Sequence, residues 1–390
     1  MLKRLFSASL ALIWLSLPAA AFETKAEAAF VMDQTTGTVL LAKNADEPLP
    51  PASMSKLMTL YMAFEAVERG KAAGGLDLVE RLPVSQHAMS YGGSTMFLDT
   101  TDRVKVEDLL RGIIVLSGND ACAVIAEALS PDGTEYGFAR MMTRRAQQLG
   151  MTNSTFANSN GWPQAGHLMS MRDLALIADR IITDFPQFYP LFAETEYLFD
   201  GRAPQNKSNR NPLLRLGIGA DGLKTGHTRE AGYGLVGSAK QGDRRVIFVI
   251  SGLDTAAERA QEAEAIVNWA FRQFTQRALG EAGTRVAEAP VALGMTQTVG
   301  LELAEDLSVL APVTGQDGVA AEVIFKGPFQ APITKGETLA ELVIDRDTLP
   351  EVRVPLVASE SVAPGGFMVK LTAAATYLLA RLNAGPQDAS

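Results

Sequence analysis

The sequence predicts an α+β domain followed by a small all-β domain. Residues 29–33 with 38–43, and residues 232–240 with 244–253, show the pattern of two β-hairpins, each closed by a short turn that contains glycine. Helical patterns fill the chain between the two hairpins. Strands at both ends of a region, with helices between them, are typical of an α+β fold.

The clearest of the predicted helices covers residues 134–149. Thr134 is a suitable N-cap, and Gly150 stands just past the end. Two further helical stretches, residues 106–116 and 121–129, lie on either side of a short polar break. Gly118 in this break predicts a loop between two helices, since glycine disfavours a continuous helix.

The all-β domain is predicted from residues 285–358. Short runs with strand character are bounded by turn residues and occupy residues 299–303, 321–325, 339–344 and 352–357. The boundary with the first domain falls near Gly280 to Gly283. This second region contains no histidine, no clustered acids and no glycine-rich phosphate loop, so a spacer or interaction module is favoured over a second enzyme.

The first residues have the pattern of an export signal. Lys3 and Arg4 precede an apolar run at residues 5–17, and a small-residue site, Ala19-Ala20-Ala21, follows. A membrane-spanning helix is the weaker alternative, because the run is shorter than the roughly 20 residues that a bilayer requires. The mature chain is expected to start near Phe22.

Bulk composition is that of an ordinary globular protein, with 390 residues, 47% hydrophobic and 20% charged. Removing Lys3 and Arg4 with the signal takes the formal net charge from −9 to −11. This acidic balance argues against nucleic acid as a partner, because phosphate binding requires a basic surface. The single cysteine, Cys122, excludes an intramolecular disulfide, and its apolar neighbours favour a small core residue over a nucleophile.

The first motif with chemical meaning is Ser53-x-x-Lys56 at the start of a helical pattern that continues to Arg69. Residues three apart share one helix face, so the Lys56 amine is expected beside the Ser53 hydroxyl, which needs a base to become a nucleophile. The motif also occurs by chance in many chains, and alone it does not establish catalysis.

The second motif, Ser117-Gly118-Asn119, places a hydroxyl and an amide on the loop between two helices, where they can reach a cleft. The alternative is that Ser117 or Asn119 only caps the next helix.

The third motif, Lys224-Thr225-Gly226, lies on a strand. Lys224 and Thr225 can bind a carboxylate there, and Gly226 has no side chain that would hinder a peptide from pairing with the strand. The alternative is that Lys224 is a solvated lysine beside a turn.

Together, and in this order, the three motifs resemble the D-alanyl-D-alanine carboxypeptidases, the low-molecular-mass penicillin-binding proteins. The resemblance is carried by residues 51–59 (PASMSKLMT), 117–122 (SGNDAC) and 221–226 (DGLKTG), and it extends over nearly the whole mature chain. It implies a β-lactamase-like transpeptidase fold for the first domain. It also implies a serine D-Ala-D-Ala carboxypeptidase that β-lactams acylate.

The resemblance further implies roles for individual residues. Ser53 attacks the substrate carbonyl, Lys56 takes its proton and Ser117 relays a proton to the leaving D-alanine. Asn119 holds the substrate amide, and Lys224 and Thr225 hold the terminal carboxylate. The backbone N–H groups of Ser53 and His227 form an oxyanion hole. Arg259 lies where the family often has an arginine near the carboxylate site, the alternative being a solvated helix charge.

Other kinds of site are disfavoured. His87, His167 and His227 are scattered without a His-Glu-x-x-His pair, so no metal or other cofactor is predicted. A Gly-x-Ser-x-Gly turn for a Ser-His-Asp hydrolase is also absent. Two alternatives remain: a β-lactamase, whose Glu-x-x-Leu-Asn loop the sequence lacks, and a non-catalytic protein that binds peptidoglycan peptides. The loop at residues 153–169 has Trp162-Pro163 where the family resemblance would give Leu-Asp.

Residues 367–383 are predicted to form an amphipathic helix. At 100° per residue, one narrow sector is apolar and holds Phe367, Leu371, Ala374, Leu378 and Leu382. The family resemblance implies that this helix lies on the outer face of the inner membrane of an exported, periplasmic protein. The alternative is that its apolar face packs on the β domain.

The predicted division is therefore an export signal at residues 1–21, the α+β domain at residues 22–279, the β-rich domain at residues 280–363, and the helix with its tail at residues 364–390.

Overall fold

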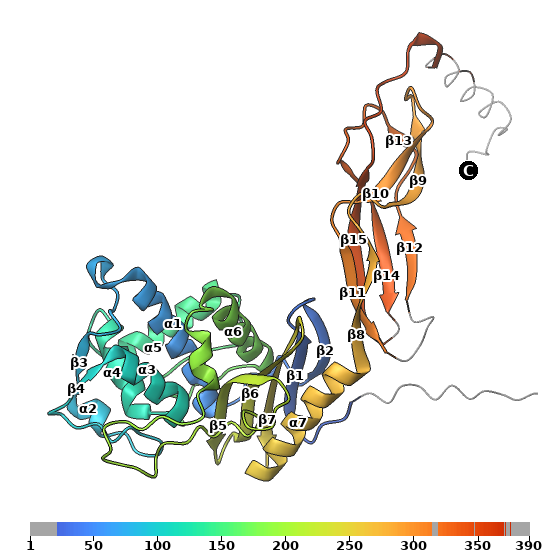
Figure 1. Ribbon diagram of the computed structural model, residues 1–390. Coiled ribbons are helices and arrows are strands. Elements are labelled where there is room, and N and C mark those ends of the chain that lie inside the picture. Colours follow the sequence, from blue (N-terminus) through green and yellow to red (C-terminus); the bar gives the residue numbers. More distant parts are fainter. Residues whose placement is uncertain (1–21, 314–318, 347, 370, 372–374, 376–390) are drawn as a thin grey trace, which may run out of the picture.

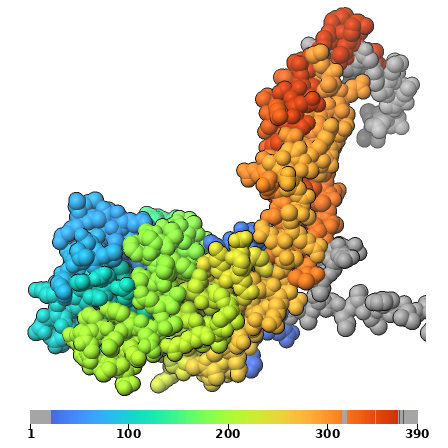
Figure 2. All heavy atoms as spheres, in the orientation of Figure 1, coloured from blue at the N-terminus to red at the C-terminus, as the bar shows by residue number. Residues whose placement is uncertain are grey.

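The structure is a computed structural model that describes residues 22–313, 319–346, 348–369, 371 and 375. A broad N-terminal domain and a narrow β domain together form an L shape (Figures 1 and 2). The predicted export signal lies outside the described residues, as does most of the predicted helix at residues 367–383. Among the described residues, no helix is long and apolar enough to cross a bilayer.

The N-terminal domain is built on a five-stranded antiparallel sheet with strand order β2-β1-β7-β6-β5. β1 (Ala28–Asp33) and β2 (Thr38–Lys43) form one predicted hairpin, and β6 (Gly232–Gln241) and β7 (Arg244–Leu253) form the other. β5 (Ala220–Thr228) is an edge strand. The prediction of an α+β fold is confirmed.

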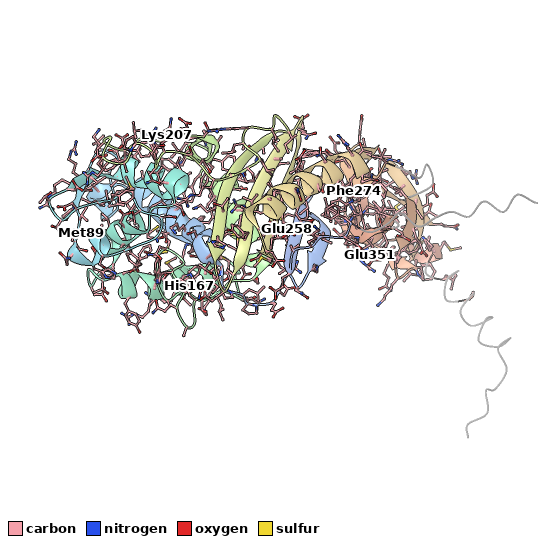
Figure 3. All side chains as sticks on the ribbon, turned by 90° about the horizontal axis from the view of Figure 1, so that it is seen from below. Met89, His167, Lys207, Glu258, Phe274 and Glu351 are labelled. Carbon is pink, nitrogen blue, oxygen red and sulfur yellow. The ribbon has the colours of Figure 1, made fainter. Side chains whose placement is uncertain are left out.

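Successive side chains of a strand point to opposite faces of the sheet. Apolar side chains on both faces of this sheet are buried. Val246, Phe248 and Ile250 of β7 pack in the core beneath α7 (Ala256–Gln273). Ile247 and Val249 face the larger core formed by the other helices. Figure 3 shows α7 running across the sheet from near Glu258 to Phe274, where the chain enters the β domain.

The helix α1 (Lys56–Arg69) lies in the centre of the helical region, and most of its side chains are buried. The predicted helix at residues 134–149 is confirmed as α5 (Glu135–Gln148), with the Thr134 hydroxyl accepting from the Gly137 N–H. The remaining elements of this region are α2 (Gln86–Met89), α3 (Val106–Arg111), α4 (Asn119–Leu129), α6 (Met171–Asp184) and the short paired strands β3 (Arg81–Pro83) and β4 (Arg103–Lys105).

The β domain contains a six-stranded sheet with the order β12-β14-β15-β10-β9-β13, and a separate pair, β11-β8. All four strands predicted from the sequence are present, as β10, β12, β14 and β15, and further strands lie between them. The bounds of the eight strands are β8 Phe274–Gly280, β9 Arg285–Ala292, β10 Thr298–Leu303, β11 Leu307–Pro312, β12 Ala320–Ile324, β13 Phe329–Gln330, β14 Thr338–Arg346 and β15 Leu349–Ala358.

The junction between the domains lies at the end of α7. The chain continues from α7 directly into β8 at Phe274. β8 lies before the predicted boundary near Gly280, yet it pairs with β11 and so belongs to the β domain. Phe274, Leu310 and Leu349 form a small apolar cluster there. Arg346, which is 2% exposed, donates from Nη1 to the Thr38 hydroxyl of the N-terminal domain at 3.2 Å.

Candidate active site

Ser53 lies in a 3₁₀ turn (Ala52–Ser55) that leads directly into α1, and not in the first α-helical turn as the sequence predicted. In a 3₁₀ turn, side chains three apart eclipse one another, so Lys56 stands directly over Ser53. The Lys56 Nζ atom is 2.6 Å from the Ser53 Oγ atom. The preceding residue, Ala52, adopts a left-handed conformation with φ of 47°, a strained arrangement of the kind found at functional sites.

The amine of Lys56 is fully buried, and it donates to the backbone carbonyl of Asn160 at 2.6 Å. Burial lowers its pKa from the usual 10.5 to about 8, because a charged amine is poorly solvated in the protein interior. Near neutral pH the charged form of Lys56 still predominates, but the neutral form, which can act as a base, is far more populated than in an ordinary lysine.

The loop that supplies the Asn160 carbonyl is held by its own side chains. Asn158 accepts from the Gly161 N–H at 2.9 Å and donates to the Trp162 carbonyl at 2.9 Å. Gly161 has φ of 83°, and an added Cβ would lie 1.9 Å from the Ala52 carbonyl oxygen. Only glycine fits at this position, so the loop sits tightly against the turn that carries Ser53.

Ser117 and Asn119 lie at the break between a π-helical turn (Gly112–Leu116) and α4. Ser117 has a left-handed φ of 62°, and its hydroxyl accepts from Lys224 at 2.9 Å. Asn119 donates from its amide to the Gly92 carbonyl at 2.8 Å. Neither side chain caps α4, whose N-cap is Gly118 without a side-chain hydrogen bond, so the capping alternative is wrong.

Lys224, Thr225 and Gly226 lie on the edge strand β5, with both Lys224 and Thr225 buried. Lys224 is only 2% exposed, so the alternative of a solvated surface lysine is wrong. Gly226 lies against the 3₁₀ turn, where an added Cβ would come within 3.0 Å of the Pro51 carbonyl oxygen. Glycine thus lets β5 approach the turn that carries Ser53.

Several positive charges surround Lys224. Arg259 is 8% exposed and packs over the Tyr233 ring, so it is not the solvated helix charge that the alternative required. Arg210 donates to the Ser94 hydroxyl and to the Leu116 carbonyl, beside Ser117. Burial first, and then the charges of Lys56 and Arg210, hold the pKa of Lys224 well below its usual value.

A groove of about 430 Å³ lies beside the Ser53 turn. Trp162, 45% exposed, forms part of its wall together with Pro163. Glu230 lies at the exposed end of the same lining. Its other lining residues are Pro50, Pro51, Ala52, Gly161, Gln164, Ala165, Gly166, His167, Leu168 and Thr228.

Three further residues named in the sequence analysis, His227, Cys122 and His167, differ in their exposure. His227 is exposed and stacks on Tyr233, with ring centroids 3.8 Å apart. Cys122 is buried, and burial raises the pKa of its thiol to about 12, so it is a core residue as predicted. His167 is also buried, which lowers its pKa to about 4, and its Nδ1 accepts from the Ala157 N–H.

Three contributors to this site were not predicted from the sequence. Asn160 acts through its main-chain carbonyl, which any residue type would provide. Arg210 stands in a loop of no regular pattern and approaches the site only in the folded chain. Asp120 is buried and accepts from the Met96 and Leu98 N–H groups, and its place directly after Ser117-Gly118-Asn119 was a signal that could have been used.

Comparison with known proteins assigns both domains. Residues 16–255 match the D-alanyl-D-alanine carboxypeptidase family, and residues 274–364 match the C-terminal domain of penicillin-binding protein 5. The D-alanyl-D-alanine carboxypeptidase DacF of Bacillus subtilis is 35% identical over 358 residues, which cover 89% of this chain and 88% of that protein.

Solved structures agree. The carboxypeptidase DacD of Francisella tularensis aligns with a TM-score of 0.76 at 29% identity, covering 92% of this chain and 97% of that one. Penicillin-binding protein D2 of Listeria monocytogenes, solved with ampicillin bound, aligns with a TM-score of 0.56 at 30% identity, covering 64% of this chain and 98% of that one. The three motifs meet at one site in a fold shared with these proteins, and the chain belongs to the D-alanyl-D-alanine carboxypeptidase family of serine peptidases.

Proposed function

We propose that this protein removes the terminal D-alanine from peptidoglycan stem peptides that end in D-Ala-D-Ala, through an acyl-enzyme on Ser53. The observation that carries the proposal is the buried Lys56 amine, 2.6 Å from the Ser53 hydroxyl and with a pKa of about 8. A serine hydroxyl becomes a nucleophile when such a base can accept its proton. Family membership supplies the substrate class.

In the acylation step, Ser53 Oγ attacks the carbonyl carbon of the penultimate D-alanine while its proton passes to Lys56. The negative charge on the carbonyl oxygen is stabilised by the Ser53 and His227 N–H groups, the proposed oxyanion hole. When the peptide bond breaks, Ser117, held by a hydrogen bond from Lys224 Nζ at 2.9 Å, passes its proton to the departing amine, and the proton that Lys56 took from Ser53 replaces it. Water then attacks the acyl carbonyl carbon while Lys56 accepts a proton from that water, and Lys56 gives the proton to Ser53 Oγ as the acyl group leaves.

Substrate selection follows from charge and from the sheet edge. Arg259 and Arg210 carry positive charge near Lys224 and attract the terminal carboxylate, to which the Lys224 amine and the Thr225 hydroxyl can donate hydrogen bonds. β5 is the edge strand, so an extended peptide can pair with it. Asn119, fixed by its bond to Gly92, is placed to hold the substrate amide.

The direct test is release of D-alanine from a pentapeptide ending in D-Ala-D-Ala, with a pentapeptide ending in D-Ala-L-Ala as the control. We expect release of one D-alanine per molecule of the first peptide and no release of L-alanine from the second. A cross-linked peptide dimer in a third reaction measures endopeptidase activity. Failure to release D-alanine from the first peptide would contradict the proposed function.

Acylation is expected to accelerate as pH rises through about 8. Only the neutral amine of Lys56 can accept the proton from Ser53, and burial lowers its pKa to about 8, so the active base form accumulates above that pH. The measurement is the rate constant of penicillin acylation from about pH 6 to about pH 10. A rate constant that is still rising at about pH 10, with no midpoint near 8, would show that Lys56 keeps a pKa near the usual 10.5 or is not the base.

Replacing Lys224 by alanine is expected to lower kcat/KM for peptides with a free carboxylate by about 10- to 100-fold, the effect of losing one charged hydrogen-bond partner. A peptide amide lacks that carboxylate and should lose much less. Lys240→Ala, an exposed lysine on the neighbouring strand β6, is the control. An equal loss of kcat/KM on both peptides would show that Lys224 does not bind the carboxylate.

We also propose that the protein is exported to the periplasm and attached to the outer face of the inner membrane by the helix at residues 367–383. The support is the signal pattern at residues 1–21 and the apolar sector of the helix, which is too short to span a bilayer. Residues 360–390 carry no net charge, so attraction to lipid would be mainly apolar.

A truncation that ends at Pro364 tests this attachment. We expect the full-length protein to sediment with inner membranes and the truncated protein to remain in the soluble periplasmic fraction, with penicillin labelling of both proteins as the control for folding. If full-length protein is equally soluble without detergent, the attachment through this helix is wrong.

A further inference from the structure

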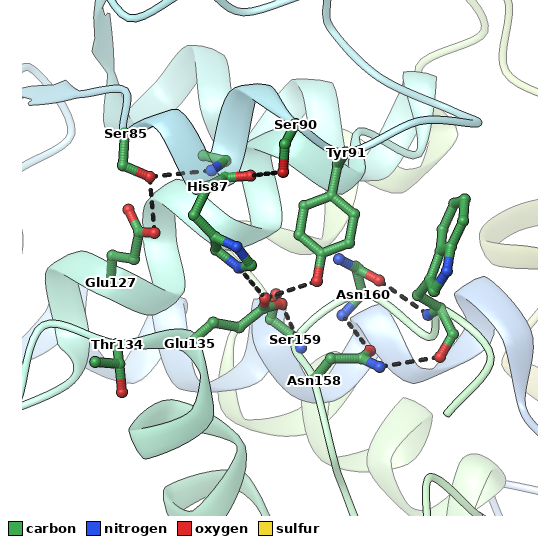
Figure 4. Close-up of polar contacts among 12 residues, drawn as sticks. Ser85, His87, Ser90, Tyr91, Glu127, Thr134, Glu135, Asn158, Ser159 and Asn160 are labelled. Carbon is green, nitrogen blue, oxygen red and sulfur yellow. Dashed lines mark hydrogen bonds and ion pairs between the residues drawn. The ribbon is translucent and has the colours of Figure 1, made fainter. Parts of the chain in front are cut away.

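A buried carboxylate, Glu135, lies behind the active site and is not part of the reacting set. Its side chain is 7% exposed at the first residue of α5. One oxygen, Oε1, accepts from the N–H of Ser159 at 2.9 Å and from the Ser159 hydroxyl. The other, Oε2, is 2.6 Å from the Tyr91 hydroxyl and 2.7 Å from Nε2 of His87, and Figure 4 shows the carboxylate between these groups.

The Ser159 contact leads to the general base. The Ser159 carbonyl accepts from the Thr59 hydroxyl of α1, so the backbone of Ser159 is held at both its N–H and its C=O. The next residue, Asn160, presents the carbonyl that accepts from Lys56 at 2.6 Å. The position of that carbonyl, and with it the orientation of the Lys56 amine toward Ser53, depends on where Ser159 is fixed.

The Tyr91 contact leads to the substrate-binding side. Gly92, the next residue, has the carbonyl that accepts from the Asn119 side chain at 2.8 Å. The Ser94 carbonyl accepts from the Asn119 N–H, also at 2.8 Å. The Tyr91 ring meets Trp162 edge to face, with ring centroids 6.1 Å apart. One carboxylate therefore joins the two segments that hold Lys56 and Asn119.

The charge of Glu135 suits this position. Burial raises the pKa of Glu135, but hydrogen bonds from Ser159, Tyr91 and His87 outweigh burial and hold the pKa below its usual value. The group is therefore ionised at neutral pH and accepts from all its partners. Hydrogen bonds to a charged acceptor are shorter and stronger than neutral ones, so the two segments are held firmly.

We propose that Glu135 is a positioning residue, which fixes the Asn160 carbonyl for Lys56 and the segment at residues 91–94 for Asn119. The inference rests on the proposed function for its reaction, but the geometry concerns only groups of this chain. Glu135 touches no substrate atom and acts through Ser159 and Tyr91. Misplacing a catalytic group by about 1 Å costs on the order of 100-fold in rate, so loss of this anchor should be visible in acylation.

The test is Glu135→Gln, which keeps the size of the side chain and removes its charge. The matched control is Glu127→Gln, the same chemical change at a neighbouring carboxylate, which accepts from the Ser85 hydroxyl (Figure 4). The readout is the rate constant of penicillin acylation at saturating penicillin, counted per folded active site. A residue that serves stability alone would lower the folded fraction and leave this rate constant unchanged.

We expect Glu135→Gln to lower this rate constant by about 10- to 100-fold. We expect Glu127→Gln to leave the rate constant within about twofold of the wild-type value, which is well below the tenfold change that corresponds to about 1.4 kcal/mol. A Glu135→Gln protein that acylates at the wild-type rate, or that fails to fold at all, would overturn the positioning role. If wild type acylates but releases no D-alanine from peptides, the proposed function fails while this comparison still stands.

A crystal structure of Glu135→Gln gives a second readout that needs no activity. We expect the Asn160 carbonyl to leave hydrogen-bonding distance of the Lys56 amine, which is 2.6 Å in the native protein. The same distance in the variant would overturn the proposal, whatever the enzyme is found to catalyse.

Discussion

Replacing Ser53 by alanine is expected to abolish both covalent penicillin labelling and D-alanine release. The hydroxyl is the only atom of the site that forms a bond to the substrate in the proposed mechanism, so no covalent intermediate remains without it. Removal of a nucleophile that acts together with its base typically lowers kcat by about 10⁴- to 10⁶-fold. The measurement is labelling with a fluorescent penicillin, followed on denaturing gels, together with D-alanine release.

The control for Ser53→Ala is Ser55→Ala in the same turn. Ser55 is buried, and its hydroxyl has no hydrogen-bond partner among the described residues, so its loss should cost little. Covalent labelling of Ser53→Ala at the wild-type rate would place the nucleophile elsewhere.

Replacing Lys56 by arginine is expected to lower the acylation rate by about 10²- to 10⁴-fold, the usual contribution of a general base. A guanidinium is effectively never deprotonated in a protein, so it keeps the charge and loses the base. The Lys56 side chain is fully buried, and its amine donates to the Asn160 carbonyl. A guanidinium at this position would therefore stay beside Ser53, where it cannot accept the proton.

Lys71→Arg serves as the control, because Lys71 is an exposed partner of Glu80 in the 3₁₀ turn (Lys71–Ala73) that follows the far end of α1 from Ser53. Thermal unfolding of both variants shows whether Lys56→Arg is folded. A folded Lys56→Arg protein that acylates at the wild-type rate would exclude Lys56 as the base and leave Ser117 with Lys224 as the remaining pair.

The elements that sequence reasoning located best are those with local signals. The hairpins β1-β2 and β6-β7 and the helix α5 each carry a turn glycine or a cap within the segment itself, and all three were found. Ser53 and Lys56 are three residues apart, so their contact follows from local geometry. Local patterns do not indicate that their turn is 3₁₀, nor that Ala52 has a left-handed conformation.

Contacts between distant segments were beyond reach of local patterns. The bond between Lys224 and Ser117 joins residues 107 positions apart, and only the family resemblance indicated that the two motifs meet. β8 has a strand sequence directly after a helix, and its place in the β domain is decided by pairing with β11. Glu135 was assigned only to a helix, because its bonds to Tyr91 and Ser159 depend on the folding of three separate segments.

The most direct test of the central claim is mass spectrometry of the penicillin adduct on the wild-type protein. We predict one equivalent of intact penicillin attached to the peptide that contains Ser53, because Ser53 Oγ opens the β-lactam ring as it would attack D-Ala-D-Ala. Attachment to another residue would contradict the assignment of the nucleophile. Unmodified protein together with rapidly hydrolysed penicillin in solution would contradict the carboxypeptidase function and favour a β-lactamase.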